Sequence, residues 1–186
     1  ITGTQTLVAI GDAAGSNTGV IIQSTSNVWQ VLIQGSGTVP APAPIIQVNQ
    51  FHEVVVTYAG GSASVLIYVN GVVVNGSGSI TMNLTNATVK MGRNYSSTSP
   101  LFGGLSDVRV WNVALTANQI ATMYQTRVVP TTGLVRRYKL NEGTGTAIAD
   151  SSVTNDTGTV TNPLWSRNNV PYGLGEIASA TPNQLP

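Results

Sequence analysis

Two glycine-containing turns divide residues 51–74 into three short apolar segments, and this pattern constrains the fold more than any other part of the chain. The segments are Phe51–Ala59, Ser62–Val69 and Val72–Val74, separated by Gly60-Gly61 and Asn70-Gly71. Asn-Gly between two apolar runs favours a two-residue hairpin, because a type I′ turn needs positive φ at both central positions. The sequence therefore predicts a three-stranded antiparallel meander.

The first two strands of this meander are apolar on both faces. Val54-Val55-Val56 and Val65-Leu66-Ile67 lack the alternation that is typical of a strand with one face in water. We therefore expect these strands to be central and to pack one face against a partner sheet.

The rest of the chain also favours β-structure, because the β-branched residues valine and threonine are its two commonest residues. The run of prolines at 40, 42 and 44 predicts an extended connector or sheet edge, since proline donates no backbone hydrogen bond. Thr116 and Gln119 form a capping-box pattern that predicts a short helix over Ala117–Gln125. Further strands are predicted at Thr6–Ile10, Gly19–Gln23, Val28–Gln34, Thr88–Met91, Ser106–Trp111, Gly133–Asn141 and Val160–Trp165. Together these elements predict an all-β fold, an antiparallel two-sheet jelly-roll sandwich with one short helix.

Charge is scarce, which excludes several functions. Eight Lys and Arg face seven Asp and Glu, and charged residues make up 8% of the chain. A nucleic-acid partner needs a basic stripe that these cations do not supply. The chain has no cysteine and one histidine, so thiolate sites and multi-histidine zinc sites are excluded. The longest apolar runs fall far short of the roughly 20 residues of a membrane span.

Several motifs resemble the concanavalin A-like jelly rolls, in particular the laminin-G-like and pentraxin-related branch. A hairpin of this kind is seen at 51–58 (FHEVVVTY) and 66–71 (LIYVNG), and a following strand at 89–93 (VKMGR). The closing signature of such domains is matched at 102–124 (FGGLSDVRVWNVALTANQIATMY). The resemblance covers about residues 4–124 and implies a sandwich whose loops bind ligands at one rim.

The opening motif of such domains is found after the closing one, at 133–152 (GLVRRYKLNEGTGTAIADSS). Either it begins a second domain that is too short to be completed, or it is a permuted strand segment that docks on this sandwich, which we favour. We therefore assign 1–166 to one domain, with 130–166 as the permuted segment, and 167–186 to an extended C-terminal arm. The chain starts at Ile1 without a signal-peptide pattern, so we expect a processed chain or a piece of a longer one.

A sugar site usually combines an aromatic side chain with amide groups beside it. Tyr95 and Asn94 lie in the long loop from 92 to 104, and Trp29 lies in an early strand. These three are the candidate ligand-binding residues.

Calcium is the candidate cofactor, because it prefers carboxylate, amide and carbonyl oxygens. Asp150, Asn155 and Asp156 form an oxygen-rich loop and are the candidate metal ligands. The resemblance to pentraxins implies acidic ligands near residue 93, but Arg93 occupies that position, which argues against a pentraxin-type site.

Catalysis is not expected. Glycoside hydrolysis needs two carboxylates flanking one bond, and no predicted strand carries a pair of acids. His52 lacks a nucleophile-elbow motif elsewhere in the chain and is interpreted as a structural strand residue.

The sequence thus favours a non-catalytic extracellular or virion-surface binding and adhesion module that recognises carbohydrate or another cell-surface ligand. The alternative is a structural virion component, such as a phage capsid decoration or tail protein. It would act by protein–protein assembly or as a homo-oligomer through the C-terminal arm. No nucleic acid and no membrane span are expected in either case.

Overall fold

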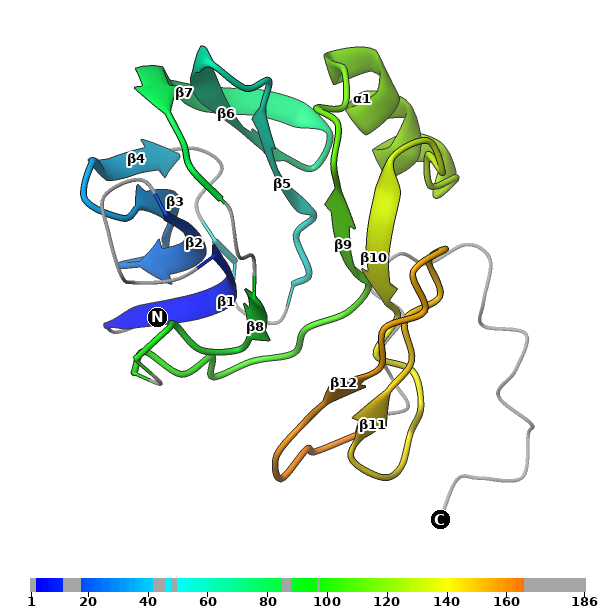
Figure 1. Cartoon of the computed structure of the whole chain (residues 1–186). Helices are drawn as coiled ribbons and strands as arrows, with labels where there is room; N and C mark the ends of the chain where they lie inside the picture. The colour runs from blue at the N-terminus through cyan, green and yellow to red at the C-terminus, as the bar shows by residue number, and fades with distance from the viewer. Residues whose placement is uncertain are drawn as a thin grey trace.

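A computed structural model describes residues 3–11, 18–41, 46–47, 50–84, 88–96 and 98–165 as a sandwich of two antiparallel β-layers (Figure 1). The first layer is a five-stranded sheet with the order β4-β3-β2-β1-β8. Its strands are β1 (Thr4–Gly11), β2 (Gly19–Thr25), β3 (Val28–Ile33), β4 (Gly37–Ala41) and β8 (Thr88–Met91).

The second layer contains the predicted meander and a separate two-stranded ladder beside it. The meander has the order β5-β6-β7, and the ladder pairs β10 with β9. A two-residue pair, β11 with β12, follows β10 in the chain. The bounds are β5 (Val54–Tyr58), β6 (Ser62–Val69), β7 (Val72–Thr81), β9 (Val108–Trp111), β10 (Leu134–Tyr138), β11 (Ala147–Ile148) and β12 (Gly158–Thr159).

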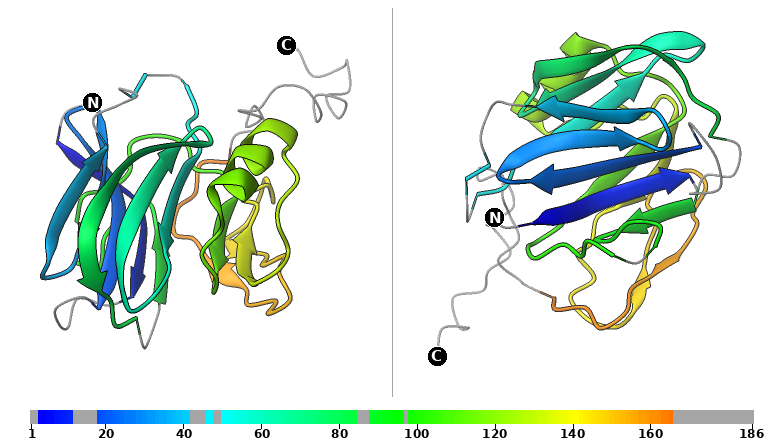
Figure 2. Two further views of the ribbon diagram at one scale, coloured as in Figure 1. Left: turned by 90° about the horizontal axis from the view of Figure 1, so that it is seen from above. Right: turned by 90° about the vertical axis from the view of Figure 1, so that its left-hand side faces the viewer.

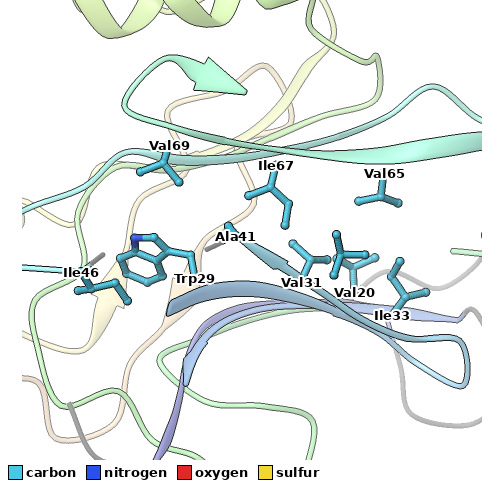
Figure 3. Packing of buried hydrophobic residues seen from close by; sticks show 10 residues of the cluster. Val20, Trp29, Val31, Ile33, Ala41, Ile46, Val65, Ile67 and Val69 are labelled. Carbon is cyan, nitrogen blue, oxygen red and sulfur yellow. The ribbon is translucent and has the colours of Figure 1, made fainter. Parts of the chain in front are cut away.

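The main core lies between the two layers (Figure 3). Val31 and Ile33 of β3 point from the first sheet toward Ile67 of β6, and all three are fully buried. Alternate residues of β6 face this core, so its other face is free for a second contact. That alternation explains why the sequence of β6 is apolar on both faces.

The other face of β6 is covered by α1 (Ala117–Thr126), which Figure 2 shows on the side away from the five-stranded sheet. Ile120 and Met123 of the helix pack with Tyr68 of β6. The helix begins as predicted, since Gln119 N–H donates to the Thr116 hydroxyl and the Gln119 side chain accepts from Thr116 N–H at 2.8 Å.

A second cluster joins β1 to strands from later in the chain. Val8 of β1 packs with Val108 of β9, Tyr138 of β10 and Ile148 of β11. Tyr138 also forms an isolated bridge with Asp150. Tyr138 and Ile148, in the segment that resembles a domain opening, thus contact residues of β1 and β9.

The predicted all-β antiparallel sandwich with one short helix is confirmed. The meander turns through Asn70 (φ 52°) and Gly71 (φ 81°), which have the positive φ that the Asn-Gly pair predicts. The proline-rich stretch supplies β4, which is the edge strand of the five-stranded sheet. Pro40 is tolerated there because it has no backbone N–H to donate to a neighbouring strand. Pro42 and Pro44 lie outside the described residues.

Three strand predictions need correction. The strand predicted at Phe51–Ala59 begins only at Val54 and ends at Tyr58, so Phe51 and His52 precede it. No strand forms at Val160–Trp165; β12 ends earlier, at Thr159. Asn162 has a φ of 50° and Pro163 donates no hydrogen bond, so the chain turns where a strand was expected. The strand predicted to reach Asn141 ends at Tyr138, and Leu140 has a φ of 58°. The arm predicted at 167–186 lies outside the described residues.

Candidate functional site

The two phenylalanines of the chain lie at one rim of the sandwich. Phe51 lies just before β5, and Phe102 lies in the connection from β8 to β9. The side chain of Phe102 is 80% exposed and that of Phe51 is 37% exposed. The ring of Phe51 lies against Gly104, where an added Cβ would be 3.2 Å from Cζ of the ring. Phe51 and the Phe102–Gly104 segment, from distant parts of the chain, therefore lie at a common surface, which we call the phenylalanine rim (Phe51, Phe102–Gly104).

The loop that carries Phe102 is fixed to the first sheet. Phe102 N–H donates to Gln5 Oε1 at 3.0 Å, and Thr6 N–H of the same strand donates to Ser99 O at 2.9 Å. Leu101 N–H donates to Gly92 O at 2.9 Å and closes the loop on itself. The exposed ring is thus presented on an ordered backbone, which lowers the entropy that ligand binding would cost.

The rim has the chemistry of a platform for a neutral, ring-shaped ligand. A phenyl ring offers a flat apolar face with a negative quadrupole, and the C–H groups of a sugar ring can stack on such a face. Gly103 and Gly104 add no side chain between the two phenylalanines. The arrangement supplies contact area, and it contains no nucleophile or acid–base pair.

Asn94 and Tyr95 lie in the loop that leads to the rim, but their polar groups are used within the protein. Asn94 Oδ1 accepts from Ser96 N–H at 3.1 Å and from Thr98 N–H at 2.9 Å, and its Nδ2 donates to Thr98 Oγ1 at 2.7 Å. The half-buried Tyr95 directs its hydroxyl toward Ile10 O and lies 3.1 Å from Val20 O. Both side chains therefore shape and anchor the loop.

Trp29 does not supply an exposed aromatic face. It is 8% exposed and belongs to the core, with its ring 5.9 Å from that of His52 in an edge-to-face contact. His52 is only half-buried, and burial lowers the pKa of its imidazole, which keeps it neutral at pH 7. The expectation that Trp29 contacts a ligand is thus corrected by its burial. His52 packs against Trp29 but lies just before β5, and not within a strand as expected.

Asp150 is 3% exposed, and four donors surround its carboxylate. Arg137 N–H and Ser152 N–H each donate to Oδ1 at 2.8 Å, while the Thr154 hydroxyl and Asp156 N–H donate to Oδ2 at 2.9 and 3.2 Å. Burial by itself would raise the pKa of Asp150, but the backbone and hydroxyl donors outweigh it and hold the pKa far below its usual range. The carboxylate therefore organises its own loop.

This loop does not fit calcium. The Asp156 carboxylate pairs with the Arg136 guanidinium, and Asn155 is exposed with a φ of 50°. A calcium ion needs six to eight free oxygens, whereas those of Asp150 already accept hydrogen bonds. In the part of the chain that the structure describes, no three His, Cys, Asp or Glu side chains are placed to hold a metal ion.

Two acids that are far apart in the sequence do meet, at Arg109 of β9. Arg109 Nη1 lies 3.5 Å from Glu53 Oε2, and Nη2 donates to Asp107. Arg137 also holds Asp107, through Nε at 2.9 Å and Nη2 at 3.0 Å. Burial raises the pKa of Glu53, while the hydrogen bonds from Arg137 and Arg109 outweigh burial and lower that of Asp107.

Spacing along the sequence did not reveal this pair, because Glu53 and Asp107 are distant in the sequence and lie just before β5 and just before β9. The guanidinium of Arg109 contacts both carboxylates, so both acids are engaged in ion pairs with the same arginine. The arrangement is an ion-pair network that connects β5, β9 and β10.

Sequence reasoning also missed the phenylalanine rim. In the sequence, Phe102 belongs to the closing signature at 102–124, and Phe51 begins the predicted strand Phe51–Ala59. Neither pattern indicates a binding residue. The available signal was an aromatic residue followed by two glycines in a polar loop, but exposure depends on the tertiary fold.

Comparisons with known proteins agree with the fold. Residues 2–121 match the family model of the concanavalin A-like lectin/glucanases superfamily. No curated protein matches the chain. None of the described helices is long and apolar enough to cross a membrane.

Two solved structures are similar. A proposed carbohydrate-binding protein from Bacteroides ovatus ATCC 8483 aligns with a TM-score of 0.58 and 22% identity, over 84% of this chain and 51% of that one. The chain therefore spans about half the length of that protein, and the likeness concerns the fold. An S-layer domain-containing protein from Clostridium thermocellum ATCC 27405 aligns with a TM-score of 0.40 and 20% identity, over 67% of this chain and 64% of that one.

Proposed function

Because the chain belongs to the concanavalin A-like lectin/glucanases superfamily, we propose that it is a non-catalytic module that binds carbohydrate through the phenylalanine rim. The fold of the family supports a binding role. The ion-pair network at Arg109 supports the absence of hydrolysis, since its acids are bound to arginines.

The exposure of Phe102 is the observation that carries this proposal. A phenyl ring left 80% in water gives no packing energy to the folded protein, yet its backbone is fixed by a hydrogen bond to Gln5. An exposed aromatic ring on an ordered backbone offers contact area that a ligand can bury on binding.

The expected ligand is a neutral sugar. Glu53, the acid nearest in sequence to Phe51, is buried and paired with Arg109, so its charge is compensated. Uncharged hydroxyl and amide groups dominate the polar composition of the chain, which supports a role outside the cytoplasm, in adhesion to a cell surface.

A glycan array tests this proposal. We expect the chain to bind neutral glycans equally with calcium and with EDTA, because the Asp150 oxygens are already occupied. Phe102→Ala should lose these signals. Leu164→Ala, at a side chain that is 100% exposed elsewhere, is the matched control and should retain them.

Blank arrays together with self-assembly of the chain would contradict carbohydrate binding and would favour the structural virion component. Glycan binding that EDTA abolishes would contradict the assignment of Asp150 as an organiser of its loop.

A further inference from the structure

A cleft of about 370 Å³ opens where β5 and β9 lie beside each other in the second layer. Among the described strands, β9 pairs with β10 and not with β5, so the layer is not closed by backbone hydrogen bonds at this point. The floor of the cleft is the inner face of the first sheet, and its walls are valines of the two strands. Its apolar lining includes Val8, Ile22, Val54, Val56, Val108 and Val110.

Two buried polar atoms on residues that line this cleft have no partner among the described residues. They are Glu53 Oε1, an acceptor, and Arg109 Nε, a donor. Glu53 is 9% exposed, and the side chain of Arg109 is 12% exposed. An unpaired buried acceptor or donor costs about 1–3 kcal/mol, so two of them beside one cavity call for a partner.

The remaining polar atoms of these two side chains are already used. Arg109 Nη1 contacts Glu53 Oε2 at 3.5 Å and Met123 Sδ at 3.2 Å, and Nη2 donates to Asp107. One acceptor and one donor thus remain on residues that line a cavity whose surface is mostly apolar. A hydroxyl group can donate to the first and accept from the second without bringing a charge into the protein.

We propose that the cleft between β5 and β9 binds a small, mostly apolar molecule that carries one hydroxyl group, which donates to Glu53 Oε1 and accepts from Arg109 Nε. The cavity has the size of a site for a compact one- or two-ring alcohol or phenol. A sugar does not fit this lining, because most of its hydroxyl groups would remain unpaired among valines. The site is therefore separate from the phenylalanine rim and does not depend on the proposed function.

Titration of the full chain with 2-naphthol, and with naphthalene as the analogue without a hydroxyl, tests the proposal. Binding is followed by amide chemical shifts in two-dimensional NMR. We expect saturable binding of 2-naphthol, with shifts at β5 and β9, and at least tenfold weaker binding of naphthalene. Glu53→Gln should weaken 2-naphthol binding several-fold and reduce the preference over naphthalene.

Val56→Phe places a ring in the cavity and should abolish binding, whereas Val153→Phe adds the same ring at a 90% exposed position and should leave binding unchanged. If Val56→Phe does not fold, the ratio of the two affinities and the location of the shifts decide the question. No saturable binding of 2-naphthol, equal affinity for naphthalene, or shifts confined to other strands would overturn the proposal.

Discussion

Asp150 illustrates how one buried carboxylate can determine a loop. The four hydrogen bonds that it accepts connect the residues after β11 to the backbone of Arg137 in β10. From sequence alone, such an acid in a loop with Asn155 and Asp156 is equally well interpreted as a calcium ligand. Whether such an acid binds calcium or accepts hydrogen bonds from its own loop depends on where the backbone N–H groups point. The residue types alone do not determine that direction.

Asp150→Asn should lower stability at pH 7 and reduce its acid dependence. The carboxyl pKa is depressed in the folded state, so its contribution is complete above the unfolded pKa of about 3.9 and is lost as the pH falls toward the folded value. We expect the variant to lose about 1–3 kcal/mol of unfolding free energy at pH 7, because an amide nitrogen cannot accept from Thr154 and Asp156. Urea unfolding at pH 7 and pH 3 measures both effects.

Asp156→Asn is the control for this experiment, since its side chain is 58% exposed and pairs with Arg136 at the surface. It should change stability by less than about 1 kcal/mol. Equal loss in the two variants, or an unchanged pH dependence in Asp150→Asn, would contradict the role given to Asp150.

At the scale of elements, the turn between β6 and β7 also positions the helix. Gly71 has a φ of 81°, and an added Cβ would lie 2.9 Å from Tyr124 Cβ of α1. Gly60 has a φ of 90° in the turn before β6, with nothing within 4 Å of the added atom. The two turns therefore share the left-handed backbone and differ in contact with the helix.

Gly60→Ala should cost about 1 kcal/mol, the strain of a left-handed alanine. Gly71→Ala should cost at least about 2 kcal/mol, because overpacking against Tyr124 is added to the same strain. Chemical denaturation of both variants measures the difference. Equal losses would show that the turn does not support α1.

We propose that residues 130–166, which the structure describes up to residue 165, are a permuted strand segment of this domain. The pairing of β10 with β9 and the packing of Tyr138 and Ile148 with Val8 support this proposal. Amide hydrogen exchange tests it. The amides of β10 that pair with β9 should open with nearly the free energy of those in β6, and the two-residue strands β11 and β12 should exchange faster. Rapid exchange throughout β10 while β6 stays protected would show that the segment is not part of the domain.

The predictability of these elements follows the range of the interactions that determine them. The meander and the capped helix could be predicted because Asn70-Gly71 and the Thr116–Gln119 box act within a few residues. The strand at Val160–Trp165 failed because Asn162 and Pro163 turn the chain there. The contact of Glu53 with Arg109 joins residues 56 positions apart, and no local pattern announces it.

At the scale of the whole molecule, the two layers place loops of distant origin at a common rim. Phe51 lies just before β5 and Gly104 lies in the connection from β8 to β9, and only the folded sandwich brings the ring of Phe51 against Gly104. The aromatic residues chosen from sequence, Trp29 and Tyr95, are used inside the fold. Residue type identified the kind of group that binds sugar, but exposure is a property of the whole molecule.

The affinity for a neutral glycan identified on the array, measured by titration calorimetry on the wild type and on Phe102→Ala, tests the central claim most directly. We predict at least about a tenfold loss of affinity, or about 1.4 kcal/mol, with an unfolding free energy within about 0.5 kcal/mol of the wild type. Leu164→Ala should match the wild type in both quantities. Unchanged glycan affinity in Phe102→Ala would contradict the claim that this chain binds carbohydrate at the phenylalanine rim.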